Sequence, residues 1–179
     1  IWPGSMHVSR GYAEAAHSYE YLKPDTNLSD DNKLNGTKTL VLNGKNASKV
    51  IVSCVRNGEL SLVLVDKTAE GVSFNTFKTI DEKTCAEFTF ENVSIQDSDV
   101  IASGDEAKNL LIETINLATL CISAEAVGCM VSCYNKTVQY TKEREQFDQP
   151  ISNFQVLQHR MVDMFMYEYC LYIQKLNSF

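Results

Sequence analysis

The 179-residue sequence lacks clusters of lysine and arginine, and this absence excludes one broad class of function. Its 16 basic residues are outnumbered by 23 acidic ones, which gives a formal net charge of −7 at pH 7. A nonspecific nucleic-acid binder needs clustered positive charge to neutralise phosphates. We therefore expect no nucleic-acid partner.

The sequence also has little that points to a membrane or to secretion. No window suggests the roughly 20 apolar residues that cross a bilayer, and no basic region followed by an apolar run begins the chain. A hydrophobic content of 44% is ordinary for a soluble globular protein. We expect no membrane span and a cytosolic or organellar location, with cytoplasmic as the specific prediction.

Metal-binding spacings are missing as well, although the chain has six cysteines. No CxxC pair and no cysteine–histidine pattern occurs, so we expect no metal site. Cys121, Cys129 and Cys133 recur at multiples of four residues. This spacing predicts buried thiols on one face of a helix.

Asparagine–glycine dipeptides divide the segment 33–101 into short runs that are rich in β-branched residues. Asn-Gly is a strong turn signal, and it occurs at Asn35, Asn43 and Asn57. Phe88, Phe90 and Val93 follow the pattern of a half-buried strand with a bulge. The sequence predicts antiparallel strands at 37–42, 49–55, 60–65, 72–80 and 85–93, which would form a small barrel or sandwich.

A long helix is predicted after this segment. Ser103 and Glu106 have the spacing of a capping box, and apolar residues then recur at helical intervals from Leu110 to Val127. A helix that continued to Lys142 would be about 57 Å long, more than the core of a 179-residue globule could cover. We predict an α+β protein with a β domain at 1–102 and, at 103–179, the truncated start of an up-and-down helical bundle.

A tight connection between two helices is predicted near Pro150. Pro150 and the Ser152-x-x-Gln155 capping box indicate that one helix ends near Arg144 and that another begins near Asn153. The connection would hold Arg144 and Gln155 close together, where a guanidinium and an amide can bind a pyrophosphate. Alternatively, Arg144 only complements the carbonyl end of its helix and Phe147 fills the core.

Two stretches of the sequence resemble the acyl-CoA dehydrogenase family, flavoenzymes that remove two hydrogens from the α and β carbons of acyl-CoA thioesters. REQFDQPISNFQVLQHRMVDM, from Arg144 to Met164, resembles the family's RxxFGxPIxxFQxxQHxxxDM signature, and KLNGTKTLVLNG resembles its xLNGxKxWITNG hairpin. In both stretches the order of the residues is kept. The resemblance implies an FAD-binding protein in which the β domain is the family's middle domain.

The resemblance also implies which residues contact the cofactor. Arg144, Phe147 and Gln155 match residues that hold the adenosine-diphosphate half of the FAD of the neighbouring subunit, and Ala13 and Leu42 match positions beside the flavin. The usual glycine after the phenylalanine is Asp148 here, which places a carboxylate near the phosphate and favours a different turn.

Other positions depart from the family pattern around the flavin. The usual Trp-Ile-Thr is Leu40-Val41-Leu42, which keeps apolar packing but loses a hydroxyl near flavin N5. The family's TEPxAGSD corresponds to 13–20, where only Glu14 is retained, and we interpret His17 as a solvated loop residue. These replacements, together with CISAEAVGCM at 121–130, resemble a bacterial pimeloyl-CoA-type subgroup with paired large and small subunits.

A catalytic base is not found. Relatives that carry it on the long helix have it 26 residues before the signature arginine, which corresponds to Ala118, and the substrate positions beside it are Asn116 and Thr119. Glu113 and Glu125 are interpreted as solvated carboxylates. In most relatives the base lies in later helices, so the catalytic residue stays unknown and the chain alone is expected to be inactive.

These observations predict a flavoprotein oxidoreductase of fatty acid metabolism that carries out FAD-dependent α,β-dehydrogenation of acyl-CoA. The expected acceptor is an electron-transfer flavoprotein, and the expected assembly is a homodimer, a homotetramer or a paired subunit. Two alternatives stay open: a non-catalytic FAD-binding or assembly subunit of a paired enzyme, and an acyl-CoA oxidase that uses dioxygen. The acyl chain length is not predicted.

Overall fold

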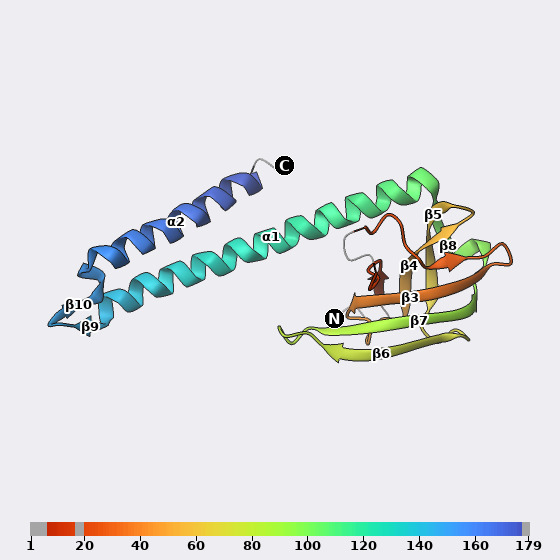
Figure 1. Cartoon of the computed structure of the whole chain (residues 1–179), viewed down its shortest axis with the longest axis horizontal. Helices are drawn as coiled ribbons and strands as arrows, with labels where there is room; N and C mark the ends of the chain where they lie inside the picture. Colours follow the sequence, from red (N-terminus) through yellow and green to blue (C-terminus); the bar gives the residue numbers. More distant parts are fainter. Residues whose placement is uncertain (1–6, 17–19, 177–179) are drawn as a thin grey trace. The chain divides into compact units, whose positions relative to one another are not determined.

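A computed structural model describes residues 7–16 and 20–176 (Figure 1). The chain divides into two compact units, Ile1–Ile112 and Glu113–Phe179. The first unit holds the sheet and the beginning of a long helix. The second holds the rest of that helix and a second helix.

An eight-stranded sheet forms the first unit. Its strands run in the order β6-β7-β3-β2-β4-β5-β8, and β1 also pairs with β4. The bounds are β1 (Val8–Gly11), β2 (Asn27–Leu28), β3 (Lys33–Leu42), β4 (Lys49–Arg56), β5 (Glu59–Asp66), β6 (Val72–Lys78), β7 (Thr84–Ser94) and β8 (Val100–Ser103), with a 3-10 turn, η1, at Asp97–Asp99.

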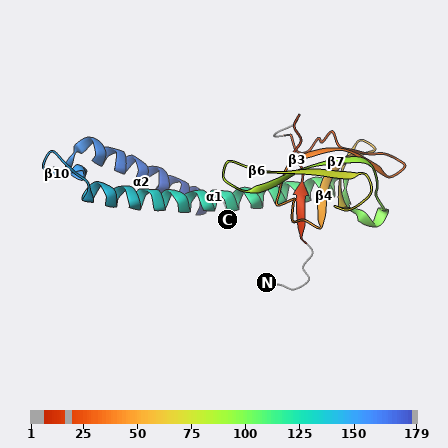
Figure 2. The same ribbon diagram turned by 90° about the horizontal axis from the view of Figure 1, so that it is seen from below.

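The sheet confirms the five predicted strands, and it contains short strands that were not predicted. Strands β3, β4, β5 and β7 cover the predicted ranges, and β6 ends at Lys78, two residues before the predicted end. They make antiparallel pairs, and Figure 2 shows β6, β7 and β3 side by side. However, β1 and β2 pair with β4 in parallel, so the sheet is mixed. Within the described residues, β6 and β8 are the two ends of the strand order and no closed barrel forms.

The three asparagine–glycine dipeptides have different roles. Asn57 and Gly58 form the two-residue turn between β4 and β5, with φ values of 53° and 81°. Both positive values are typical of the tight hairpin turns that match strand twist. Asn43 also lies in a turn, since the amide of Gly44 donates to the carbonyl of Val41 over 3.1 Å.

The turn predicted at Asn35-Gly36 is wrong. Both residues lie inside β3, at a shift in its register with β7. A Cβ atom on Gly36 would lie 2.6 Å from Thr26 Oγ1 and 2.7 Å from Thr26 Cα. The glycine therefore permits the close approach of the neighbouring backbone and does not reverse the chain.

Aromatic and branched side chains form the core of the sheet. Phe88, Phe90 and Val93 are buried, as their alternation predicts, and the rings of Phe88 and Phe90 stack with centroids 6.3 Å apart. On β6, Phe74 stacks on Phe88 at 5.3 Å. The bulge predicted in this strand is present at Asn92, which has a φ of 53°.

The second unit consists of two helices joined by a short hairpin, and the first turns of the first helix belong to the first unit. Helix α1 spans Gly104–Glu143, which confirms the long helix, and α2 spans Gln155–Leu176. Strands β9 (Glu145–Gln146) and β10 (Gln149–Pro150) and the 3-10 turn η2 (Ile151–Asn153) connect them. The rings of Tyr134 and Phe165 lie 5.8 Å apart between the two helices.

Neither predicted capping box forms as expected. The hydroxyl of Ser103 is hydrogen-bonded to that of Ser61 on β5 over 3.0 Å, so it joins β8 to β5. Helix α2 begins two residues later than predicted, because η2 precedes it and the hydrogen bonds of the first turn run to the carbonyl of Phe154.

One expectation about α1 is wrong. Cys121, Cys129 and Cys133 are exposed, whereas Cys54 and Cys85 in the sheet are buried. Among the described helices, α1 also has the length and composition of a membrane span, with a mean hydropathy of 1.6 in its most apolar window. Long core helices of soluble proteins have the same composition. The cysteines are exposed because just 6% of the most apolar window of α1 is buried within the described chain.

A glycine pair tests the packing of the sheet. Gly71 and Gly58 both have positive φ, but an added Cβ would lie 2.2 Å from the carbonyl oxygen of Glu91 at Gly71 and would meet nothing within 4 Å at Gly58. We expect Gly58→Ala to lower the free energy of unfolding by about 1 to 2 kcal/mol from backbone strain alone. Gly71→Ala should lower it clearly further, as measured by urea titration, and equal losses would contradict this packing.

Candidate functional site

A buried ion pair links the beginning of the sheet to its centre. Lys38, on β3, is fully buried and donates from Nζ to Oε1 of Glu14 over 2.5 Å and to the hydroxyl of Ser53, on β4, over 3.1 Å. Glu14 lies after β1 and also accepts from the Thr26 hydroxyl at 2.6 Å, from the Thr26 amide at 3.0 Å and from the Asp25 amide at 2.6 Å. Every carboxylate oxygen is thus hydrogen-bonded.

These contacts determine the charge state of the pair. Burial by itself raises the pKa of Glu14, but the hydrogen bonds from Lys38, Thr26 and Asp25 outweigh burial and hold that pKa below its usual range. Burial lowers the pKa of Lys38, and the contact with Glu14 opposes this effect. Nearby, burial raises the pKa of Cys54 to about 11, so this cysteine is a neutral thiol and not a nucleophile.

Sequence reasoning kept Glu14 only as a family match and missed Lys38. A signal was present, because Lys38 lies in phase with buried Leu34 on a strand whose side chains alternate between faces. A lysine at an inward position needs a partner, since an isolated buried charge is very unfavourable. Removing one partner of a buried pair costs about 3 to 5 kcal/mol.

Next to the ion pair, the end of β3 presents an apolar edge. Leu40 and Leu42 are 55% and 58% exposed, while Val41 between them is fully buried. Leu40 has a φ of 51°, and the pairing of β3 with β7 shifts between Lys38 and Val41. This bulge places Leu40 and Leu42 at the surface. Ala13, the other predicted flavin contact in the sheet, accepts a hydrogen bond at its carbonyl from the amide of Thr39 over 2.9 Å.

The other predicted cofactor residues lie around the hairpin after α1. Arg144 follows the last residue of α1, Phe147 lies in the two-residue turn between β9 and β10, and Gln155 is the first residue of α2. All three are exposed. The amide of Ile151 donates to the carbonyl of Arg144 over 2.8 Å, which folds the connection back on the end of α1.

Backbone conformation in this turn explains how the aspartate is accommodated. Phe147 and Asp148 have φ values of 55° and 61°, the pair of positive values typical of tight hairpin turns. Aspartate tolerates the left-handed conformation better than most residues. Phe147 is 85% exposed and contacts Phe154 edge to face, at 6.1 Å between centroids, so it does not fill the core of the described chain.

The candidate catalytic positions on α1 carry no general base. Ala118 is half-buried, and the hydroxyl of Thr119 donates to the carbonyl of Ile115 within the helix over 2.8 Å. Glu113 and Glu125 are exposed, in accord with their interpretation as solvated carboxylates. His17 lies outside the described residues. Among the described residues, no group of three or more histidine, cysteine or acidic side chains could hold a metal ion.

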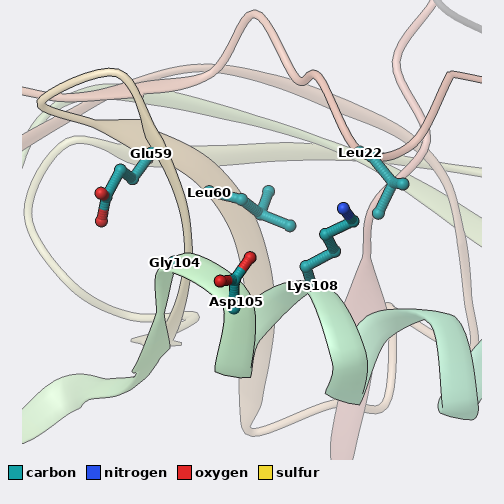
Figure 3. Close-up of a pocket in the computed structure, with 6 residues that line it drawn as sticks. All are labelled: Leu22, Glu59, Leu60, Gly104, Asp105 and Lys108. Atoms are coloured by element: carbon teal, nitrogen blue, oxygen red, sulfur yellow. The ribbon is translucent and has the colours of Figure 1, made fainter.

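A separate pocket of about 230 Å³ opens at the start of α1 (Figure 3). It contains none of the residues that the sequence predicts for the cofactor. Two carboxylates and one ammonium group share its wall, a mixture that selects neither an anion nor a cation. The pocket is lined by Leu22, Glu59, Leu60, Gly104, Asp105 and Lys108.

The ion pair predicts how stability changes with pH. Because the folded-state pKa of Glu14 is below its unfolded value, its stabilisation is complete above the unfolded pKa, about 4.5, and is lost as the pH falls through the folded pKa. We expect the urea midpoint of the native sequence to decrease as the pH is lowered below about 4.5. The midpoint of Glu14→Gln should change much less over the same pH range. The control Asp81→Asn removes an exposed carboxylate whose pKa is also lowered, and it should stay close to the native slope. Equal slopes in Glu14→Gln and the native sequence would disprove the role of the pair.

Comparison with known proteins places this geometry in a family. Residues 109–171 match the family model for the acyl-CoA dehydrogenase C-terminal domain. The chain is 29% identical over 143 residues to the mitochondrial 2-methylacyl-CoA dehydrogenase of Solanum tuberosum, with 74% of this chain and 34% of that enzyme covered. It is 30% identical over 136 residues to the mitochondrial short/branched chain specific acyl-CoA dehydrogenase of Rattus norvegicus, with coverages of 65% and 31%.

Solved structures share the fold. Glutaryl-CoA dehydrogenase from Mycobacterium smegmatis superposes with a TM-score of 0.87 at 24% identity, over 95% of this chain and 45% of that one. The chain spans about a third of the length of the curated relatives named here. The family model over residues 109–171, the curated relatives and the signature from Arg144 to Met164 agree in their likeness to the acyl-CoA dehydrogenase family, whose members are FAD-dependent oxidoreductases, and the shared fold is consistent with it.

Proposed function

We propose that this chain supplies the flavin-binding sheet and the first long helices of an enzyme that dehydrogenates acyl-CoA thioesters between the α and β carbons. The observation that carries the proposal is the exposed hairpin at 144–155, where three residues of the family signature lie at the surface. The domain limits 1–102 and 103–179 are part of the proposal, since they follow the family's division into a middle and a C-terminal domain.

The apolar edge of β3 supports a flavin site in the sheet. Leu40 and Leu42 offer exposed apolar surface beside the Ala13 backbone, where a planar ring system would remove these side chains from water. Bound FAD would supply hydride acceptance at N5. The chain would contribute packing and orientation there, because the hydroxyl of the family's threonine is absent at Leu42.

The hairpin supports binding of the adenosine-diphosphate half of an FAD held by another subunit. Arg144 provides a guanidinium with several donors, Gln155 provides an amide at the start of α2, and Phe147 exposes most of its ring. An exposed phenylalanine held in a left-handed turn is costly for a monomer. This cost would be offset if a second subunit packed its cofactor against the Phe147 ring, in a homodimer, a homotetramer or a paired assembly.

The residue that removes the α proton is not assigned within this chain. Ala118 cannot abstract a proton, and Glu113 and Glu125 are exposed on α1, without a hydrogen-bond or ion-pair partner among the described residues. This observation also favours the second candidate function, an FAD-binding or assembly subunit that supports an active partner. A carboxylate aimed at the flavin from another part of the full-length protein would distinguish the enzyme from the subunit.

The partners follow from the proposed reaction. Acyl-CoA is the substrate, and an electron-transfer flavoprotein takes the electrons, whereas peroxide production would identify the alternative, an acyl-CoA oxidase. The cytoplasmic location stays a prediction, because the two relatives named above are mitochondrial proteins.

Arg144 provides the first test, in the full-length protein that contains this chain. Arg144→Ala removes charge-assisted hydrogen bonds worth roughly 1.5 to 3 kcal/mol, so FAD should bind about ten- to a hundredfold more weakly. Arg144→Lys should restore only part of the loss, since an ammonium lacks the planar fork. The readout is flavin absorbance per protomer after gel filtration.

Arg160, which is exposed on α2, gives the matched control. Arg160→Ala removes the same charge and should leave flavin content unchanged. Unchanged occupancy in Arg144→Ala would remove the residue-level support for the hairpin site. Equal occupancy in Arg144→Lys and the native protein would indicate that this residue only caps its helix.

The isolated 179-residue chain provides the second test. We expect no turnover above background with a panel of acyl-CoA esters and an artificial electron acceptor, because Ala118 supplies no base. A complete acyl-CoA dehydrogenase in the same assay is the positive control. Clear turnover by the purified chain would show that a base within it has been overlooked.

A further inference from the structure

We propose that the Glu14–Lys38 ion pair is a positioning device for the flavin, which sets the relative placement of the Ala13 backbone and the bulged end of β3. This inference rests on the proposed flavin site. Lys38 is fully buried and Glu14 nearly so, and neither is assigned a contact with cofactor or substrate. Glu14 would act through Ala13, which precedes it, and Lys38 would act through the residues that follow it on β3.

Adjacency in the sequence connects the pair to both sides of the proposed site. Glu14 directly follows Ala13, and Lys38 directly precedes Thr39, whose amide donates to the Ala13 carbonyl over 2.9 Å. The ion pair, at 2.5 Å between Nζ and Oε1, is therefore a second connection between the same two segments, one residue after Ala13 in the first and one residue before Thr39 in the second. Two connections fix a relative orientation that a single hydrogen bond leaves free to rotate.

The bulge needs such an anchor. A left-handed φ of 51° is strained for leucine and persists only where its surroundings determine it. Lys38 and Val41, the residues at the two ends of the register shift, are both completely buried. The lysine is thus the fixed point before the bulge, and Val41 is the fixed point after it.

Close packing around the lysine stem supports the same role. A Cβ atom on Gly11, the last residue of β1, would lie 3.2 Å from both Cβ and Cγ of Lys38. The stem therefore passes directly over the end of β1, the strand that leads into Ala13. Thr26, the residue before β2, and Ser53, on β4, complete the polar contacts of the pair. Displacing the ammonium group would disturb the two segments that carry the proposed flavin contacts.

The test uses the full-length holoprotein and a double variant, Glu14→Gln with Lys38→Met. Replacing both members of a buried pair with neutral groups removes the charge without leaving an unpaired ion, and stability often survives such a change. We expect the double variant to unfold cooperatively in urea, to bind FAD about tenfold more weakly, and to show an altered shape of the flavin absorption bands. Arg56→Gln is the control, because Arg56 and Asp97 form an ion pair at the surface of the same sheet, at 3.5 Å. It should change neither affinity nor spectrum.

Each outcome decides the matter. If native protein and double variant bind FAD with equal affinity and identical spectra, the pair only stabilises the fold and the inference is wrong, while the proposed function stands. If the native full-length protein binds no FAD, both fail. Should the double variant not fold, Thr26→Val removes one hydrogen bond to Glu14 Oε1 and leaves the ion pair in place. A severalfold loss of FAD affinity in that variant supports the inference, and an unchanged affinity overturns it.

Discussion

The sheet of this protein depends on one buried charge and its neutralisation. Lys38 lies in the middle of β3 with no exposed surface, and Glu14 neutralises it while accepting four hydrogen bonds from three residues. The ion pair brings together the ends of β1 and β2 with β3 and β4, which are distant in sequence. Apolar packing alone would leave the short strands β1 and β2 weakly specified, since they offer few side chains to the core.

Left-handed backbone positions then determine which side chains reach the surface. The bulge at Leu40 brings two leucines out of β3 on either side of a buried valine. The turn at Phe147 and Asp148 exposes an aromatic ring in the same manner between two helices. Leu40 and Phe147 tolerate positive φ less well than glycine would. Each lies at a position that the acyl-CoA dehydrogenase family uses for the cofactor. Strained backbone is typical of binding sites, where an outside partner compensates for its cost.

Most of the elements could be predicted from the sequence, but several contacts could not. The local periodicity of apolar residues predicts the long strands and the 40-residue helix. Strands β1, β2 and β8 have two to four residues and depend on partners far along the chain, so no local pattern indicates them. Asn35-Gly36 has the composition of a turn, yet the close approach of Thr26 is what requires its glycine. Exposure of the α1 cysteines depends on what covers that helix, which its own sequence does not specify.

The residues of the proposed cofactor site could be predicted only where the sequence resembles the family signature. Arg144, Phe147 and Gln155 could be placed at a helical hairpin, and the structure does place them there. The ion pair beside the proposed flavin site was not predicted, because the sequence alone does not show that Lys38 and Glu14 are buried against each other. Sequence similarity identified Glu14, and alternation along β3 would have identified Lys38.

The central claim is that the hairpin of one subunit reaches the FAD held by the sheet of another. A crystal structure of the full-length protein with FAD tests it most directly, through the distance between the Arg144 guanidinium and the pyrophosphate oxygens of the partner's cofactor. The account predicts a hydrogen-bonding distance of about 2.7 to 2.9 Å, with the isoalloxazine against Leu40 and Leu42. An Arg144 side chain in solvent, with FAD bound elsewhere, would contradict it.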